Sequence, residues 1–219
     1  MQRLPLFPLN SVLFPGMPIN LRIFEERYKL MIGECIEQRE PFGVVLIRSG
    51  AEVDGLGADA VPYAVGCTAH ITQVQPLIAG QMNIVAVGRD RFQILKLETD
   101  LPYLVGQVEM LPFANETPTE THRAARRLRP WVEKYLTLLG SAENVEFDLN
   151  QLPQDSLLLA YLSASLIKVA MTEKQDLLAT DSAMGLIQRV YSYYRKEVTL
   201  LTALMAETTQ IDQGPFSLN

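Results

Sequence analysis

The spacing of apolar residues changes near Phe113, and this change constrains the fold more than any other feature of the sequence. Before it, apolar and polar residues alternate in short runs such as 19–23 and 65–71, which is the period of half-buried strands. After it, apolar residues recur every three or four positions, as in 184–205, which is the period of amphipathic helices. We therefore expect a strand domain in residues 1–113, a helical bundle in 114–208 and a flexible tail in 209–219.

One early helix interrupts the predicted strands. Apolar residues from Tyr28 to Ile36 form a single helical stripe, so residues 25–38 are predicted to be helical, and Pro41 prevents the helix from continuing. Gly88-Arg89-Asp90 is predicted to be a hairpin turn between two strands. Because closing a sheet removes its exposed edges, a mixed β-barrel is the expected arrangement. Strands are predicted at 19–23, 42–47, 65–71, 81–87, 91–97 and 103–110.

Start and stop signals divide the second half into helices. Thr117–Glu120 has the pattern of a capping box with proline at the first helical position, and Gly140 suits a left-handed C-cap. Pro130 is predicted to kink this helix. Thr172 with Gln175 repeats the capping box. The further helices are predicted at 156–170, 174–179 and 184–205, the last with a seam suited to packing within the chain or against a partner helix.

Composition argues against several functional classes. The net charge is −6, and each half carries −3 (9 Lys+Arg against 12 Asp+Glu up to Phe113, then 10 against 13). An evenly acidic chain disfavours nucleic-acid binding, which depends on neutralising phosphates. Two cysteines, Cys35 and Cys67, are too few for a disulfide framework and lack a zinc-ligand spacing. No metal and no cofactor are predicted. No apolar run is long enough to cross a membrane, and we expect a cytoplasmic protein.

Seven segments of the sequence form a recognisable series: Leu4–Leu9 (LPLFPL), Val12–Gly16 (VLFPG), Leu21–Tyr28 (LRIFEERY), Pro41–Ile47 (PFGVVLI), Val65–Ala69 (VGCTA), Val87–Phe92 (VGRDRF) and Glu173–Leu178 (EKQDLL). In this order they resemble the amino-terminal domain of Lon proteases. The match is close in the first half and weaker in the second, over about residues 4–205.

This resemblance implies an α+β fold, in which a PUA-like mixed β pseudo-barrel with one early helix is followed by a C-terminal helical bundle. It also implies a role in engaging protein substrates. In full-length Lon proteases an ATPase module and a Ser-Lys protease domain follow, whereas this sequence has no phosphate-binding loop of the Gly-x-x-x-x-Gly-Lys type. We therefore expect a stand-alone binding module that is not an enzyme.

Eight residues are candidates for binding. Arg123 and Arg127 belong to an arginine cluster that could meet a phosphate, an acidic peptide or an acidic partner surface. A solvated helix face, with Glu120 and Glu133 pairing with arginines of the same helix, is the alternative. The other six lie in predicted turns, loops or strand faces of the first half, namely Met17, Arg22, Pro62, Tyr63, Arg89 and Arg91.

No catalytic pair is evident in the sequence. Cys67 and His70 are three residues apart on one predicted strand, so they point to opposite faces and do not form a dyad. Glu25 and Glu26 diverge around a helix, and helix capping and packing are their expected role. Gly55-Leu56-Gly57, in a predicted loop over residues 49–62, lacks the third glycine of a nucleotide site.

Three functions from different classes remain, and the third is an enzyme whose site the sequence does not reveal. The first is a module that binds polypeptide, as an adaptor or a chaperone-like protein, through loops of the barrel or a groove between barrel and bundle. The second is an RNA-binding protein, because PUA-like barrels elsewhere bind RNA; the acidic balance counts against it. We expect a polypeptide or protein partner, and neither nucleic acid nor membrane.

Overall fold

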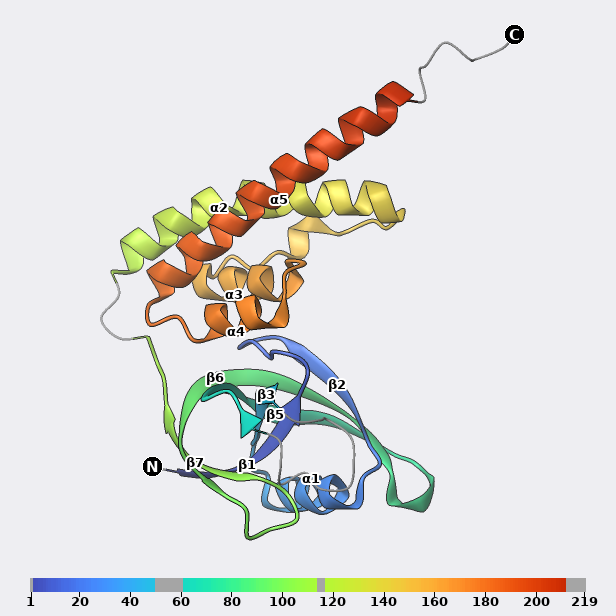
Figure 1. Ribbon diagram of the computed structural model, residues 1–219, viewed down its shortest axis with the longest axis vertical. Helices are drawn as coiled ribbons and strands as arrows, with labels where there is room; N and C mark the ends of the chain where they lie inside the picture. Colours follow the sequence, from blue (N-terminus) through green and yellow to red (C-terminus); the bar gives the residue numbers. More distant parts are fainter. Residues whose placement is uncertain (1, 50–60, 114–116, 212–219) are drawn as a thin grey trace. The chain divides into compact units, whose positions relative to one another are not determined.

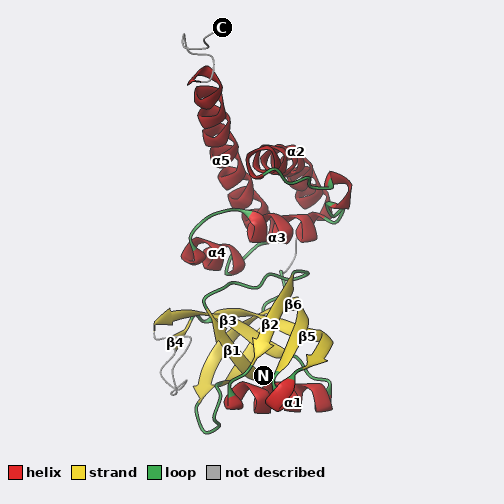
Figure 2. Cartoon of the chain, turned by 90° about the vertical axis from the view of Figure 1, so that its right-hand side faces the viewer, coloured by secondary structure: helices red, strands yellow, loops and turns green. Residues whose placement is uncertain are grey.

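The computed structural model describes residues 2–49, 61–113 and 117–211 of the chain (Figure 1). The predicted α+β architecture is confirmed, since strands fill the first half and helices the second (Figure 2). The strands are β1 (Gln2–Leu9), β2 (Pro18–Ile23), β3 (Phe42–Ser49), β4 (Val61–Pro62), β5 (Val65–Pro76), β6 (Met82–Glu98) and β7 (Val105–Met110). The helices are α1 (Glu26–Gln38), α2 (Pro118–Glu143), α3 (Ser156–Leu166), α4 (Met171–Leu178) and α5 (Ala183–Ile211), with short 3₁₀ turns η1 (Ile78–Gly80) and η2 (Leu149–Gln151).

Five strands close into a barrel. The order β1-β7-β6-β5-β3 is antiparallel throughout, and β1 then pairs with β3 in parallel, in the register from Leu6↔Gly43 to Leu9↔Leu46. β4 pairs in antiparallel with the end of β3, and β2 pairs with the first half of β6. Helix α1 lies across one end of the barrel (Figure 2). Its buried side chains, Tyr28, Met31, Ile32 and Cys35, join the main apolar core.

The predicted hairpin at Gly88-Arg89-Asp90 is wrong. Strand β6 runs through these residues without turning, and its two halves pair with different neighbours, β2 before Gly88 and β7 after Arg91. Gly88 is needed for close approach, because a Cβ there would lie 2.4 Å from the carbonyl oxygen of Phe14. Its N–H donates to Met17 O at 2.9 Å, and its own carbonyl accepts from Gly16 N at 2.8 Å.

Two glycines make room for one aromatic ring inside the barrel. Phe92 is fully buried in a cluster with Leu4, Leu6, Val45, Leu104 and Val108. A Cβ on Gly66 would lie 2.5 Å from Phe92 Cζ, and a Cβ on Gly43 would lie 2.7 Å from the same atom. Since interiors are packed to crystal density, the ring and the two glycines have to be present together.

Helices α2 and α5 pack against each other where they cross, and the C-terminal part of α5 extends beyond α2 (Figure 1). Tyr135 and Tyr194 meet edge to face with ring centroids 5.0 Å apart, and Tyr194 Oη donates to Ser163 O at 3.1 Å. Burial raises the pKa of Tyr194 above its usual range, so the phenol stays a donor. α2 continues through Pro130 and bends along its length. α5 extends to Ile211, beyond the start of the predicted tail.

The helix ends differ from the predicted caps. Thr117 occupies the N-cap position of α2 with Pro118 next, but its side chain makes no capping bond. α2 ends at Asn144 in the left-handed conformation, not at Gly140, which is buried because the chain folds back over it with Val145 O 2.4 Å from where a Cβ would lie. In α4 the N-cap is Ala170, whose N–H donates to Glu173 Oε2 at 3.1 Å, while Thr172 lies inside the helix.

The chain divides into two compact units, and each unit consists of two separate stretches of the sequence. The first holds residues 1–114 together with 164–181, and the second holds 115–163 with 182–219. The expected division placed all of 114–208 in one bundle. Helix α4 belongs instead to the barrel unit, in which Gln175 Nε2 donates to Val65 O at 2.9 Å.

Arg91 holds the α4 segment to the barrel. Its side chain is only 5% exposed, and its guanidinium donates to the carbonyl oxygens of Leu178 (2.9 Å), Thr180 (2.6 Å) and Leu111 (3.0 Å). The guanidinium carbon also lies 3.6 Å from the ring centroid of Phe113. The planar group presents several donors at fixed angles, an arrangement that lysine does not reproduce.

Replacing Gly66 by alanine is expected to destabilise the barrel. The added methyl group would collide with the Phe92 ring and with Val44 O, 2.6 Å away, so the free energy of unfolding should fall by about 1–3 kcal/mol in urea titrations. Gly33→Ala in α1 is the matched control, since nothing lies within 4 Å of a Cβ there. It should raise stability by about 0.5–1 kcal/mol, and an equal loss in both variants would contradict the packing argument.

Arg91→Lys is expected to loosen α4. The ammonium group would leave carbonyl oxygens of Leu178, Thr180 or Leu111 unpaired, which costs about 2 kcal/mol or more because hydrogen bonds to charged groups are strong. Amide hydrogen exchange should then speed up in α4 more than in α1. Arg89→Lys, at an exposed neighbouring position, should change stability by less than about 0.5 kcal/mol. Unchanged exchange in α4 would show that Arg91 does not hold this segment.

Candidate functional site

The candidate residues fall into three environments. Arg22 lines a cleft in the barrel unit, whereas Arg123 and Arg127 line a groove in the helical unit. Arg91 is buried, and its guanidinium donates to three carbonyl oxygens, so its role is to stabilise the fold. The remaining four candidates, Met17, Pro62, Tyr63 and Arg89, line neither hollow.

Those four candidates differ in how accessible they are. Pro62 is buried in β4, and the N–H of the next residue, Tyr63, donates to Leu46 O at 2.8 Å. Met17 is partly buried and packs against the main core, which leaves Arg89 as the exposed one. Most of the predicted loop over 49–62, with Gly55 and Gly57, lies outside the described residues.

The barrel cleft lies between β1 and β2. Its volume is about 210 Å³, and β2 supplies one wall from Asn20 to Ile23, continued by Phe24, while Phe7 and Leu9 of β1 supply the other. Within the part of the chain that the structure describes, β2 pairs only with β6, so its other edge carries backbone groups without a strand partner. Phe24, 49% exposed, stands beside this edge. The cleft thus combines a strand edge with an apolar hollow.

The wall of this cleft is held by a chain of contacts from the start of α1. Phe7 and Tyr28 are stacked with centroids 4.1 Å apart and planes at 15°. Arg27 lies over the Tyr28 ring at 4.5 Å and pairs with Glu25 at 2.7 Å. Glu25 was expected to cap the helix, but its side chain makes no capping bond. The most recognisable motif of the sequence therefore fixes the side of the cleft.

A larger groove, about 520 Å³ in volume, lies between α2 and α5. Arg123 and Arg127 are exposed and four residues apart on α2, so they lie side by side on one face. The expected pairings of Glu120 with Arg123 and of Glu133 with Arg129 are absent from the ion pairs of the described residues, and Arg129 instead donates to Pro153 O. The lining is Glu120, Arg123, Ala124 and Arg127 from α2, with Met184, Ile187, Gln188 and Tyr191 from α5.

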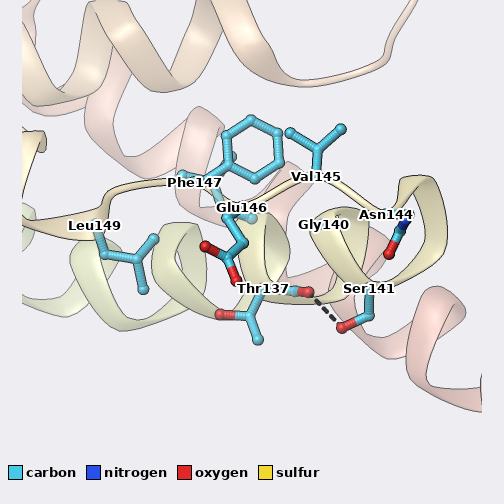
Figure 3. A pocket seen from close by; sticks show the side chains of 9 residues that line it. Thr137, Gly140, Ser141, Asn144, Val145, Glu146, Phe147 and Leu149 are labelled. Atoms are coloured by element: carbon cyan, nitrogen blue, oxygen red, sulfur yellow. Dashed lines mark hydrogen bonds between the residues drawn. The ribbon is translucent and has the colours of Figure 1, made fainter.

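A third hollow, about 640 Å³, lies where the chain turns back after α2 (Figure 3). Figure 3 shows Glu146 on the same side as Thr137 and Ser141, with Val145 and Phe147 pointing the other way. Ser141 Oγ donates to Thr137 O at 3.0 Å, which uses the hydroxyl within the helix. The lining of this hollow contains one carboxylate, that of Glu146, and no histidine, lysine or cysteine. No acid–base pair therefore forms among its side chains.

The two thiols and the barrel histidine are also poorly suited to nucleophilic chemistry. Burial raises the pKa of Cys35 to about 11 and that of Cys67 to about 12, so both stay protonated at neutral pH. Burial lowers the pKa of His70, and Arg89 lowers it further. Cys67 is fully buried whereas His70 is partly exposed, and the Cys67 thiol lies 3.5 Å from Thr68 O. This pair forms no dyad.

The described residues contain neither a cluster of metal-ligating side chains nor a helix suited to spanning a membrane. No group of three or more His, Cys, Asp or Glu side chains is placed to hold a metal ion in residues 2–49, 61–113 or 117–211. Over the same ranges, no helix has the length and apolar character needed to span a membrane.

Comparison with known proteins identifies relatives over most of the chain. Lon protease of Anaeromyxobacter dehalogenans is 27% identical over 179 residues, covering 81% of this chain and 21% of that protein. Lon protease of Paraburkholderia phytofirmans is 28% identical over 212 residues, covering 93% and 26%. The chain thus spans about a fifth to a quarter of the length of these curated relatives.

Solved structures show the same fold. The crystal structure of a Lon N-terminal domain protein from Xanthomonas campestris matches with a TM-score of 0.63 and 26% identity, covering 88% of this chain and 98% of that one. The N-terminal domain of Lon protease from the Mycobacterium avium complex also has a TM-score of 0.63, with 17% identity. The family model of the ATP-dependent protease La (LON) substrate-binding domain matches residues 3–196 of this chain. The chain therefore belongs to this family.

Proposed function

We propose that this protein is a non-catalytic module that binds polypeptide segments along the edge of β2 that has no strand partner among the described residues. The observation that carries the proposal is the position of that edge, which lies beside the apolar cleft lined by Phe7, Leu21 and Phe24. An extended segment can add to a strand edge through backbone hydrogen bonds while placing alternate side chains in a neighbouring pocket. Family membership supports a substrate-recognition role.

The size of the cleft suits this mode of recognition. About 210 Å³ is room for a single large apolar side chain rather than a small-molecule cofactor, for which pockets of roughly 300–1,000 Å³ are typical. The stacked Phe7 and Tyr28 rings make one wall rigid before any ligand arrives, and a preformed wall lowers the entropy cost of binding. Backbone pairing carries little sequence information, so the module accepts many segments that offer an apolar residue.

The proposal has no catalytic component. In the third hollow the Ser141 hydroxyl is bonded to Thr137 O within its own helix, and the two thiols, Cys35 and Cys67, are buried. An adaptor or chaperone-like role follows, in which the protein holds exposed apolar segments of other proteins and leaves them covalently unchanged. Incubation with the polypeptide probe below should therefore leave its intact mass unaltered.

Phe24→Ser is expected to weaken polypeptide binding. The probe is reduced, carboxymethylated α-lactalbumin, which stays unfolded, and affinity is measured by fluorescence anisotropy. Losing the exposed aromatic contact should weaken binding roughly tenfold, since burying such a side chain is worth about 1.5–3 kcal/mol. Leu95→Ser is the matched control, because Leu95 is similarly exposed (44%) on β6 of the same unit but does not line the cleft.

Two outcomes would contradict the proposal. Equal weakening by Phe24→Ser and Leu95→Ser would mean that binding does not use the cleft. Binding of bulk RNA on filters at low salt, with no binding of the unfolded probe, would favour the RNA-binding alternative instead. Strand addition itself is tested with a short apolar peptide whose backbone nitrogens are methylated at every second residue: methylation in one register should abolish binding, and methylation in the other should not.

A further inference from the structure

The arginine-rimmed groove between α2 and α5 is a second surface, and its chemistry differs from that of the β1–β2 cleft. We infer that it binds an amphipathic helix of a partner protein, whose apolar stripe covers the groove floor and whose acidic residues pair with Arg123 and Arg127. This surface lies in the helical unit, so the inference is independent of strand addition at β2.

The floor of the groove is apolar and firmly held. Ile187 is almost fully buried, and Met184 and Ala124 are partly buried around it. Tyr191 continues the floor, and its ring is held edge to face by Trp131 with centroids 6.2 Å apart. Partly covered apolar side chains at a preformed groove gain free energy when a partner removes them from water.

The rim of the groove carries two arginines that form no ion pair with the other described residues. Arg123 and Arg127 are both exposed, and neither appears in an ion pair or side-chain hydrogen bond of the described residues. Further along α5, the Arg195 guanidinium lies 5.8 Å from the Tyr191 ring. In a chain of net charge −6, a local basic rim over an apolar floor is complementary to a partner with carboxylates beside apolar residues.

A helical partner fits better than an extended one. The neighbouring backbone groups of α2 and α5 are already bonded within their helices, so an extended segment over this floor would leave its own N–H and C=O groups unpaired. A helix satisfies its backbone internally and can lay a stripe of side chains between two helices. Because Arg123 and Arg127 are four residues apart, they match carboxylates four residues apart on the partner.

Glu120 fixes the orientation of the bound helix. It lines the groove one turn before Arg123, so a carboxylate of the partner at that end would be repelled. The partner should therefore carry its acidic pair near Arg123 and Arg127 and a neutral or basic residue near Glu120. A helix could lie in the groove in either of two opposite directions, and the position of Glu120 favours one of them.

The test uses the full chain and three fluorescein-labelled peptides in anisotropy titrations. Each peptide is a helix of about five turns with the same leucine stripe and with Glu, Gln or Lys at two positions four residues apart. The Glu peptide should bind at low salt and weaken as salt rises, whereas the Gln and Lys peptides should bind at least tenfold more weakly. Equal binding of the Glu and Gln peptides would overturn the inference.

Variants of the exposed arginines locate the site without touching the core. The double variant Arg123→Gln, Arg127→Gln should weaken the Glu peptide by roughly tenfold or more, while Arg126→Gln, an equally exposed neighbour outside the lining, should not. The charge-reversal variant Arg123→Glu, Arg127→Glu should bind the Lys peptide more tightly than the Glu peptide. Misfolding would not produce such a gain in affinity. Equal effects of the double variant and of Arg126→Gln would contradict the site.

A second copy of this chain is the competing occupant. Sedimentation equilibrium of the wild-type chain and of the Arg123→Gln, Arg127→Gln variant distinguishes the two cases. Wild-type protein that stays monomeric and still binds the Glu peptide supports a separate partner. Self-association that the double variant removes would overturn the inference, because the groove would then be an interface between copies.

Discussion

The parallel pairing of β1 with β3 is the contact on which the barrel depends. Without it the strands β1-β7-β6-β5-β3 would form an open sheet with two long edges, and open edges recruit other strands. The pairing also aligns Leu6 with Gly43, which places the smallest residue of β3 beside the Phe92 ring. Closure and packing therefore depend on the same residues, since the Phe92 ring fits only beside Gly43 and Gly66.

Closure leaves β2 and the two-residue strand β4 outside the ring of five. β2 is held by β6 alone among the described strands, and its outer edge is where the proposed polypeptide binding takes place. On the same strand β6, Val87 pairs with Pro18 of β2. Arg91 lies four residues further along and donates to Leu178 O. One continuous strand thus supports both the candidate binding edge and the attachment of α4.

The sequence predicted the elements well and their ends less well. Periodicity predicted α1, α2 and α5 because each of these helices buries one face, and burial of one face leaves a repeating pattern. β3 was predicted from a continuous apolar run instead, since most of its side chains are buried on both faces. The turn at Gly88 was mispredicted because glycine marks turns in most sequences, whereas here it admits the Phe14 carbonyl. Gly140 was mispredicted as the C-cap of α2 for the same reason, since it admits the carbonyl oxygen of Val145. Close approach of distant backbone leaves no local signal.

The candidate sites show a similar limit. Arg123 and Arg127 could be found from sequence because four-residue spacing on a helix determines which side chains are neighbours. The role of Arg91 could not, since its acceptors on Leu178 and Thr180 lie about ninety residues away. Phe24 and the cleft beside it were missed because an exposed aromatic after a strand has no characteristic spacing; the exposed edge of β2 emerges only from the strand order.

The discontinuous barrel unit has a consequence for how such a protein can be built and inherited. The chain passes from one unit to the other at 114/115, 163/164 and 181/182, so no single gene segment encodes either unit. A reading frame ending at Phe113 would produce a barrel whose Arg91 lacks two of its carbonyl acceptors. Recombination should therefore transfer this region as a whole, and engineered fusions should respect the same boundary.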